Sequence, residues 1–336
     1  MSEARSNQHL LSVENLRVEF PTRRGTLVAV DRISFHIDEG EVLGVVGESG
    51  AGKSLTGAAI IGLLEPPGRV AEGNIVFDGE RIDDIGYEKM RRLRGNQIAM
   101  IFQDPLTSLN PLFTVGRQLT ETIRTHVSID ERKARVRAIE LLNEVGIPAA
   151  DRRVDQYPHE FSGGMRQRVV IALALAVNPR LIIADEPTTA LDVSIQAQII
   201  TLLKRLCREH GTSVMLITHD MGVIAETADR VAVMYAGRIV EIGPVGDVIK
   251  RASHPYTRGL MNSIPVIRQD IEQLVQIDGS MPRLTDIPPG CAFNPRCPKV
   301  FETCRTERPE LVDVGATKAA CWLYDYARRP GAGSTT

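Results

Sequence analysis

The chain has 336 residues, of which 43% are hydrophobic and 24% are charged, proportions that are ordinary for a soluble globular protein. This length suffices for one large domain or two modest ones. The formal net charge of −2 provides no overall attraction to nucleic acid. Residues 1–9 lack the apolar stretch of a secretory signal, and the longest apolar run, residues 169–177, is too short to span a bilayer. We therefore expect any role at a membrane to be peripheral.

In the first half of the chain, the spacing of apolar residues predicts several strands followed by helices. Alternating apolar and polar residues indicate half-buried strands, and unbroken apolar runs indicate strands buried on both faces. An amphipathic pattern that ends at Gly146 indicates a helix. The expected strands are 10–20, 28–37, 42–46, 75–77 and 98–102, and residues 115–160 are expected to be mostly helical, with one helix over 131–146.

In the second half, residues 181–184 and 214–218 are expected to be core strands of a parallel sheet, each approached by a helix. Residues 193–210 have an amphipathic pattern and are followed by Gly211, which is suited to closing a helix. A late strand pair is expected at 230–235 and 237–241.

The composition changes after about residue 250. Prolines become frequent, and four of the five cysteines lie between residues 291 and 321. We therefore place a domain boundary near residue 250, with residues 251–336 as an accessory C-terminal region. The prolines expected to interrupt regular structure there are those at 255, 265, 282, 288 and 289.

Residues 47–54 carry the motif G-x-x-x-x-G-K-[ST] between a predicted buried strand and a predicted helix. Glycines let the backbone turn so that successive N–H groups can hold phosphate oxygens, and the helix adds its positive end. Lys53 can reach the β- and γ-phosphates, and the Ser54 hydroxyl can bind Mg²⁺. The chain is therefore expected to bind a nucleoside triphosphate through Gly47, Glu48, Ser49, Gly50, Ala51, Gly52, Lys53, Ser54 and Leu55.

Two carboxylates, Asp185 and Glu186, end the predicted strand at 181–184. The carboxyl ends of such strands deliver side chains to the crevice where ligands bind in open α/β sheets. Asp185 suits a contact with Mg²⁺, usually through water, and Glu186 is placed to polarise an attacking water. An acidic turn is common in isolation, but beside a phosphate-binding motif it favours hydrolysis.

The segment Ser162-Gly163-Gly164 precedes a long apolar helix. Ser162 is expected to cap that helix, and the two glycines expose the helix start to a group that approaches closely. Taken alone, this could be an ordinary capped helix. In a chain with a complete phosphate-binding loop, it indicates a second anion-binding helix start.

The order of these motifs resembles the ATPase subunit of ATP-binding cassette (ABC) transporters over about residues 10–265. The resemblance implies an α/β P-loop NTPase fold with a mixed core sheet flanked by helices and an antiparallel β subdomain. It also implies a helical subdomain at about 105–175 and a small cysteine-rich C-terminal extension, with residues 1–250 as the nucleotide-binding domain. The matching positions are the loop at 47–54, Gln103, Ser162-Gly163-Gly164, Asp185-Glu186, Asp192 and His219.

The family pattern implies catalytic and metal-binding roles for individual residues. Gln103 would complete the coordination of Mg²⁺ by Ser54 and Asp185, and His219 would contact the γ-phosphate. The catalytic set would thus be Lys53, Gln103, Glu186 and His219.

In this family two subunits pack head to tail, so that the signature helix of one closes the nucleotide held by the other. The segment Ser162-Gly163-Gly164 would meet the partner's γ-phosphate, and Asp192 would link the two sites across the dimer. Met165 stands where the family signature has glutamine, which leaves the serine and glycines intact. Phe20 would stack on adenine, although it suits a core position of its strand equally well.

Three stretches are similar to the oligopeptide and dipeptide importer branch, which includes nickel and glutathione importers. They are residues 102–111, the segment His254-Pro255-Tyr256-Thr257 with Leu260, and the cysteine-bearing tail. The implied function is the ATPase of a peptide importer, with nickel, glutathione or another small solute as the alternative. An ABC ATPase that acts on DNA or ribosomes is the alternative from another class, but such proteins usually carry coiled-coil insertions or two cassettes.

The implied partners are a second ABC ATPase subunit (a copy or a related chain), two transmembrane permeases and an extracytoplasmic solute-binding protein, with no nucleic acid. The implied location is peripheral, at the cytoplasmic face of the inner membrane.

Cys291, Cys297, Cys304 and Cys321 lie in a segment with too little apolar sequence for a core of its own. Four thiolates in the cytoplasm suit either Zn²⁺ or an iron–sulfur cluster. The spacings lack the C-x₂-C pattern of many zinc sites, and the resemblance to peptide-importer ATPases favours a [4Fe–4S] cluster. Cys207 lies in the predicted helix at 193–210 and is expected to be a plain buried thiol.

Overall fold

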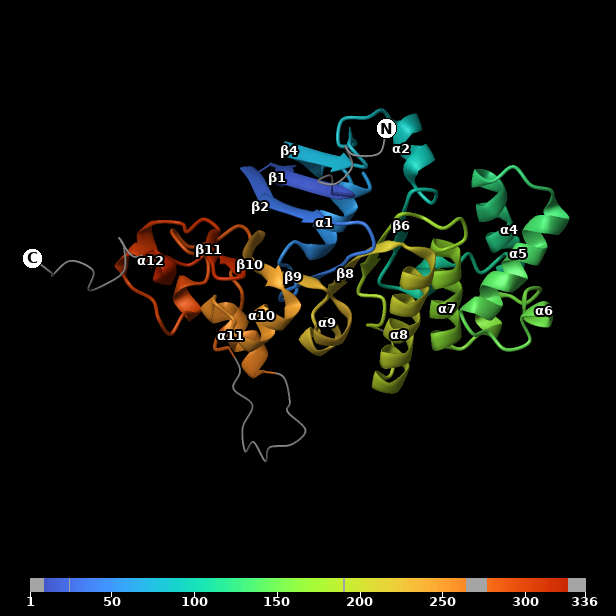
Figure 1. Cartoon of the computed structure of the whole chain (residues 1–336). Coiled ribbons are helices and arrows are strands. Elements are labelled where there is room, and N and C mark those ends of the chain that lie inside the picture. Colours follow the sequence, from blue (N-terminus) through green and yellow to red (C-terminus); the bar gives the residue numbers. More distant parts are fainter. Residues whose placement is uncertain (1–8, 24, 190, 264–276, 326–336) are drawn as a thin grey trace, which may run out of the picture. The chain divides into compact units, whose positions relative to one another are not determined.

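Residues 9–23, 25–189, 191–263 and 277–325 are described by a computed structural model of the chain (Figure 1). Contacts divide the chain into two compact units. Unit 1 comprises Met1–Leu10, Ile37–Val42 and Phe77–Ile217, and unit 2 comprises Leu11–His36, Leu43–Val76 and Thr218–Thr336.

Three parallel strands form the centre of unit 1. β7 (Leu181–Asp185) lies between β6 (Ile98–Ile101) and β8 (Ser213–Thr218), with Leu181 opposite both Ile98 and Ser213. Every residue of β7 and β8 is buried, which explains their unbroken apolar sequence. The predicted parallel core strands are therefore confirmed.

Helices make up most of the remainder of unit 1, and the cluster of α4, α5 and α7 is visible in green tones in Figure 1. Side-chain caps begin three of them: Thr114 accepts from the Arg117 N–H, Asp130 from the Lys133 N–H and Ser162 from the Met165 N–H. The helices and remaining strand of unit 1 are β5 (Glu80–Arg81), α2 (Tyr87–Leu93), α3 (Pro105–Ser108), α4 (Val115–His126), α5 (Glu131–Glu144), α6 (Ala150–Arg153), the 3₁₀ turn η1 (Pro158–Glu160), α7 (Gly163–Ala174) and α8 (Val193–His210).

Helix α8 has the bounds that its amphipathic pattern predicted, and it ends at Gly211 in the left-handed region with φ of 67°. The Gly211 N–H donates to the Arg208 carbonyl and so satisfies the helix end. Cys207 of α8 is 1% exposed, and burial raises the pKa of its thiol to about 12. It is the plain buried thiol that the sequence predicted.

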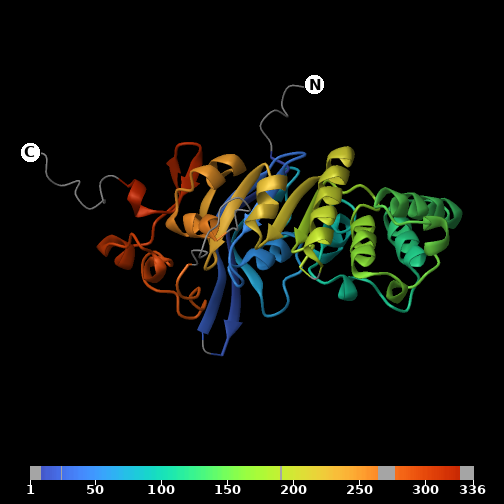
Figure 2. The same ribbon diagram turned by 90° about the horizontal axis from the view of Figure 1, so that it is seen from below.

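Unit 2 contains two groups of paired strands. In one, β1 (Leu11–Thr22) lies between β2 (Gly25–Ile37) and β4 (Arg69–Phe77), and Figure 2 shows β1 and β2 as a long ribbon in blue. In the other, β3 (Val42–Val46) pairs in parallel with β9 (Arg230–Tyr235). All residues of β3 are buried, as its apolar run predicted.

The C-terminal region adds strands to this second group. β9 pairs antiparallel with β10 (Arg238–Pro244), β10 pairs with β12 (Thr317–Ala319), and β12 pairs with β11 (Val312–Val314). The sequence predicted β9 and β10 but neither β11 nor β12. The helices of unit 2 are α1 (Lys53–Ile60), α9 (Met221–Thr227), α10 (Val245–Lys250), α11 (Pro255–Asn262), α12 (Glu302–Thr306) and the 3₁₀ turns η2 (Asn294–Arg296) and η3 (Trp322–Tyr324).

The prediction that Pro255 interrupts regular structure is wrong. Pro255 is the first residue of α11, where a helix tolerates proline because the N–H of that position has no partner within the helix. His254 caps this helix, since its Nδ1 accepts from the Tyr256 N–H at 3.1 Å. His254 is 1% exposed, and burial lowers its pKa to about 3, so the ring is neutral and can accept. Of the other prolines named for this role, Pro265 lies outside the described residues.

Candidate functional site

The glycine-rich loop joins β3 to α1 in unit 2, as the sequence predicted. Gly47, Gly50 and Gly52 have φ values of 156°, 82° and 99°, which side chains rarely adopt. A Cβ at Gly47 would lie 2.2 Å from the Met234 carbonyl oxygen, and one at Gly52 would lie 2.9 Å from that of Ala29. The glycines therefore let the loop turn and pass close to the neighbouring backbone.

The side chain of Lys53, the first residue of α1, is held against this loop. Lys53 is 5% exposed, and its Nζ donates to the carbonyl oxygens of Gly47 at 2.8 Å and Glu48 at 3.1 Å. The ammonium and the N-terminus of α1 together concentrate positive charge at the loop. Ser49 and Ser54 are exposed there, so the arrangement can receive a phosphate chain and its metal ion.

In unit 1, the structure brings Gln103 and Glu186 together although they lie 83 positions apart in the sequence. Gln103 Nε2 donates to Glu186 Oε2 at 3.2 Å, and Thr189 Oγ1 donates to the same oxygen at 2.8 Å. Asp185, the last residue of β7, is 7% exposed. Two carboxylates and an amide thus gather after β6 and β7, where they can bind a cation and orient a water.

Glu186 also has an unusual backbone. Its φ of 45° is in the left-handed region, which costs free energy for any residue other than glycine. The Glu186 N–H donates to the Ile217 carbonyl at 2.9 Å, so the turn is fixed to the neighbouring strand. Such strain is concentrated at functional sites. No sequence pattern signals this strain or the Thr189 contact, since both arise from the turn geometry.

The segment before α7 has the capping geometry that its sequence predicted. Ser162 Oγ accepts from the Met165 N–H at 3.4 Å, and Ser162 and Gly163 are both exposed. A Cβ at Gly164 would lie 2.9 Å from Cγ2 of Ile195, so this glycine also allows α7 to lie close to α8. Sequence reasoning missed that second, structural reason for glycine at position 164.

The structure also describes the three remaining predicted positions, Asp192, His219 and Phe20. Asp192 is the exposed N-cap residue of α8 in unit 1. His219 is exposed between β8 and α9 and belongs to unit 2. Phe20 of β1 is partly buried, and a Cβ at Gly68 would lie 2.6 Å from its Cε1. Its ring therefore packs on the backbone of the segment before β4, and stacking on adenine stays a prediction.

The four C-terminal cysteines line one small pocket in unit 2, together with His254, Pro255, Phe293, Asn294, Lys299, Pro309, Trp322 and Leu323. The Cys291 N–H donates to the Cys304 carbonyl at 2.9 Å, which holds two of the four segments together. Burial, together with the neighbouring cysteines, raises the pKa of Cys291 to about 12 and that of Cys321 to about 11. These thiols are therefore protonated unless a metal binds them, because metal ligation deprotonates cysteine.

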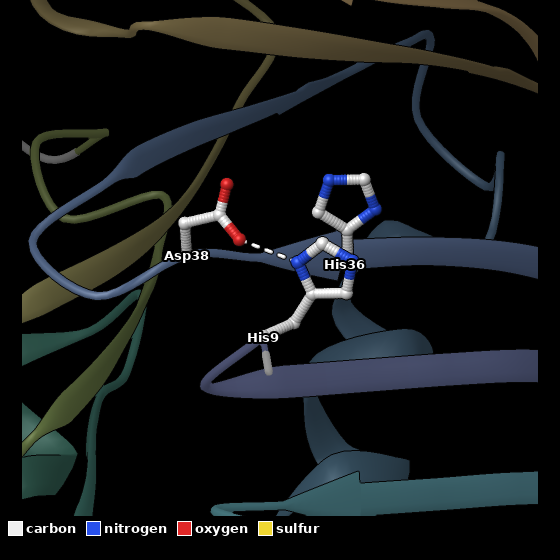
Figure 3. A group of neighbouring side chains, drawn as sticks. All are labelled: His9, His36 and Asp38. Carbon is white, nitrogen blue, oxygen red and sulfur yellow. Dashed lines mark hydrogen bonds and ion pairs between the residues drawn. The ribbon is translucent and has the colours of Figure 1, made fainter. Parts of the chain in front are cut away.

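A separate group of polar side chains lies near the start of β1 (Figure 3). Nδ1 of His9 is 2.5 Å from Oδ1 of Asp38, and the two side chains are 42% and 56% exposed. His36 lies on β2, two residues before Asp38. Exposed pairs of this kind contribute little to stability, and no catalytic motif includes them.

Comparison with known families places these sites in context. Residues 30–189 match the family described as "ABC transporter", and residues 240–304 match "Oligopeptide/dipeptide transporter, C-terminal region". The oligopeptide transport ATP-binding protein AppD of Bacillus subtilis is 48% identical over 318 residues, covering 94% of this chain and 97% of AppD. The chain belongs to the ABC transporter family. The dipeptide transport ATP-binding protein DppD of Escherichia coli K12 is 49% identical over 323 residues, covering 96% of this chain and 99% of DppD.

Solved cassettes have the same fold. The dimeric cassette MJ0796 in a post-hydrolysis state with ADP and Pi has a TM-score of 0.63 and 29% identity, covering 70% of this chain and 98% of that one. The cassette cbiO1 of Clostridium perfringens has a TM-score of 0.62 and 30% identity, and the match covers 72% of this chain and 91% of cbiO1. The predicted family and P-loop fold are therefore confirmed, and the protein is an ABC ATPase. Within the part of the cassette that the structure describes, no helix is long and apolar enough to cross a bilayer.

Proposed function

We propose that this cassette hydrolyses ATP in a peptide importer and couples ATP-driven closure of a cassette pair to solute uptake through partner permeases. The observation that carries this proposal is the similarity to peptide-transport ATP-binding proteins over 94% and 96% of the chain. That similarity includes the C-terminal region, which a cassette domain alone does not need. Nickel and glutathione transport have no such support from the relatives described above.

Within this function, the loop glycines and the start of α1 bind the phosphates of ATP. Lys53 would neutralise the β- and γ-phosphates, and Ser54, Gln103 and Asp185 would hold Mg²⁺, with Asp185 acting through water. The metal ion polarises the γ-phosphate when bound. The buried position of Lys53 at the loop carbonyls supports its role, because the ammonium is already confined to the phosphate-binding loop.

Hydrolysis of the γ-phosphate is assigned to Glu186, with His219 contacting that phosphate. Gln103 and Thr189 donate to Glu186, which fixes the orientation of its carboxylate toward an attacking water. The strained backbone at Glu186 supports a functional rather than a structural role for this turn.

The second half of each ATP site comes from another cassette. The exposed, capped start of α7 supports this role, since Ser162, Gly163 and Gly164 can present N–H groups to the γ-phosphate held by a partner. Asp192 then links the two sites. The partner is a copy of this chain or a related cassette, and the working complex also contains two permeases and an extracytoplasmic binding protein. The chain lies at the cytoplasmic face of the inner membrane without crossing it.

Reconstitution in liposomes with partner permeases of a peptide importer tests this function. ATP hydrolysis should rise when the binding protein and peptides are present, and peptide should accumulate inside. Stimulation by nickel or glutathione instead of peptide would indicate that the cassette serves a nickel or glutathione importer of the same branch. Stimulation by DNA or ribosomes alone would contradict the transport function.

We also propose that Cys291, Cys297, Cys304 and Cys321 bind a [4Fe–4S] cluster, which would join four short segments of the C-terminal region, one of them helix α12. A tetrahedral zinc ion with Zn–S bonds of 2.3 Å needs sulfur separations of about 3.8 Å. Among the described residues, which include all four cysteines, no three of their sulfur atoms lie within 4.8 Å of one another. The four cysteines line one pocket, which supports a shared metal centre, and the resemblance to peptide-importer ATPases favours the cluster over one zinc ion.

Protein purified without oxygen is expected to be brown, with a broad visible absorption band and about four iron and four sulfide per chain. Cys297→Ser should reduce both contents. Cys207→Ser is the matched control, because that cysteine is buried in α8 and outside the pocket, and it should keep both contents. Colourless protein with one zinc per chain would contradict the cluster.

A further inference from the structure

In unit 2, the side chain of Arg296 in the C-terminal region contacts the phosphate-binding loop. Its Nη1 donates to both carboxylate oxygens of Glu48, at 2.9 Å and 3.0 Å. Glu48 is the second residue of the loop, and Arg296 immediately precedes Cys297. The contact therefore joins residues that lie 248 positions apart in the sequence.

Arg296 is fixed in place by several other acceptors. Its Nε donates to the Asp278 carbonyl at 2.9 Å, and its Nη2 donates to the carbonyls of Ile277 at 3.3 Å and Gly279 at 3.2 Å. The Arg296 side chain is only 7% exposed, whereas that of Glu48 is 29% exposed. An ion pair with one partner this firmly held loses little side-chain entropy, unlike an ordinary surface pair.

A second contact from the same region holds the backbone of Glu48. The Glu48 N–H donates to the Tyr256 hydroxyl at 3.0 Å. Tyr256 is fully buried against Tyr235, with ring centroids 4.7 Å apart, and Phe293 packs on both rings at 5.3 Å and 5.5 Å. Phe293 and Arg296 lie in the loop between Cys291 and Cys297, so one short segment supplies both the aromatic packing and the cation.

These contacts continue to the ammonium of Lys53. The carbonyl of Glu48, whose N–H and side chain are held by Tyr256 and Arg296, accepts from Lys53 Nζ at 3.1 Å. Holding Glu48 in place therefore also holds its carbonyl oxygen, which accepts from the Lys53 ammonium and confines it at the phosphate-binding loop. The ion pair also compensates a carboxylate that would otherwise repel a triphosphate bound to the same loop.

We propose that Arg296 is a positioning residue for ATP, acting through Glu48, so that the C-terminal region holds the phosphate-binding loop in its nucleotide-binding shape. This inference rests on the proposed function, because it assumes that the loop binds ATP. It assigns to the C-terminal region a part in nucleotide affinity within the same chain. Arg296 itself touches no reacting atom.

The test compares ATP affinity, by calorimetric titration of the full-length chain, between wild type and Arg296→Ala. We expect the Kd of the variant to rise by about tenfold, within the range usual for coupling between sites. In the assembled transporter, KM for ATP should rise while kcat at saturation stays close to wild type. Arg308→Ala is the matched control: Arg308 also joins the C-terminal region to the cassette, through Asp31 at 2.6 Å, but it does not touch the loop. Its Kd should be unchanged.

Two further variants distinguish a positioning role of Arg296 from a general loosening of the C-terminal region. Arg296→Lys keeps the charge and should lose less affinity than Arg296→Ala. Adding Glu48→Gln to Arg296→Ala should restore part of the affinity, because the uncompensated carboxylate is removed. Thermal melting identifies a variant that fails to fold. If Arg296→Ala fails to fold, the single variants Arg296→Lys and Glu48→Gln are titrated with ATP in its place.

An unchanged Kd in folded Arg296→Ala overturns the inference, and so does an equal loss in Arg308→Ala, which would indicate loosening of the whole C-terminal region. A wild-type chain that binds no ATP contradicts the proposed function instead, so the two failures are distinguishable.

Discussion

Replacement of Glu186 by glutamine is expected to reduce ATP turnover by a factor of about 100 to 10,000, the usual contribution of a general base. The attacking water loses the group that accepts its proton, whereas the phosphate-binding loop in unit 2 is untouched. ATP should therefore still bind, and the cassette pair should remain closed on it. The hydrogen-bond partners of Glu186 support a local effect, since an amide oxygen can still accept from Gln103 or Thr189.

The measurement is steady-state phosphate release together with the association state in ATP, determined by size-exclusion chromatography. Glu209→Gln is the matched control, because Glu209 is a half-exposed carboxylate on α8 that pairs with Arg205. It should leave turnover unchanged. Wild-type hydrolysis in Glu186→Gln would remove Glu186 from the mechanism.

The second large effect is expected at the start of α7. Ser162→Arg places a long cationic side chain at an exposed helix start, where the proposed partner's nucleotide must approach. We expect ATP binding by each chain to stay close to wild type, while closure of the pair and turnover fall by at least a factor of about 100. The measurements are ATP titration, the association state in ATP and phosphate release.

Ser162→Arg also removes a helix cap, worth about 1 kcal/mol, and a control must account for that loss. Asp130 caps α5 in the same unit and accepts from the Lys133 N–H at 2.8 Å, so Asp130→Ala loses a comparable cap without adding bulk at α7. It should lower the melting temperature slightly and keep turnover. If Ser162→Arg retains both ATP binding and turnover, the α7 start does not act on a partner's nucleotide.

Much of the fold could be predicted because its signals are local. The apolar run of β3, the amphipathic pattern of α8 and the capping serine of α7 each specify an element from neighbouring residues alone. Pro255 shows the limit of such reasoning. Proline can begin a helix as well as interrupt one, and the deciding contact is a histidine cap formed in the fold.

The strands β11 and β12 could not be predicted, because each has only three residues. β12 pairs with β10, which lies more than 70 residues earlier in the chain, and β11 joins the sheet through β12. Pairing over such a separation leaves no periodic pattern in the sequence. Their attachment to β10 means that the C-terminal region shares a sheet with strands assigned to the ATPase domain. The domain boundary near residue 250 stays a prediction.

The candidate site shows the same division between local and distant information. The motifs identified the loop, Gln103, Asp185 and Glu186, because their residue types carry the chemistry. They did not identify Arg296, because an arginine among prolines and cysteines has no sequence signal for a partner 248 positions away. Contacts that support a site from a distance depend on the folded chain.

The central claim is that one cassette supplies only half of each working ATP site. The most direct measurement is ATP turnover per chain as a function of concentration, with the association state determined by sedimentation in the same buffer. It is made for this chain alone and for this chain mixed with a related cassette. We predict that turnover per chain rises in proportion to the paired fraction and approaches zero in the monomer. A chain shown to remain monomeric that hydrolyses ATP at the rate of the assembled transporter would contradict the claim.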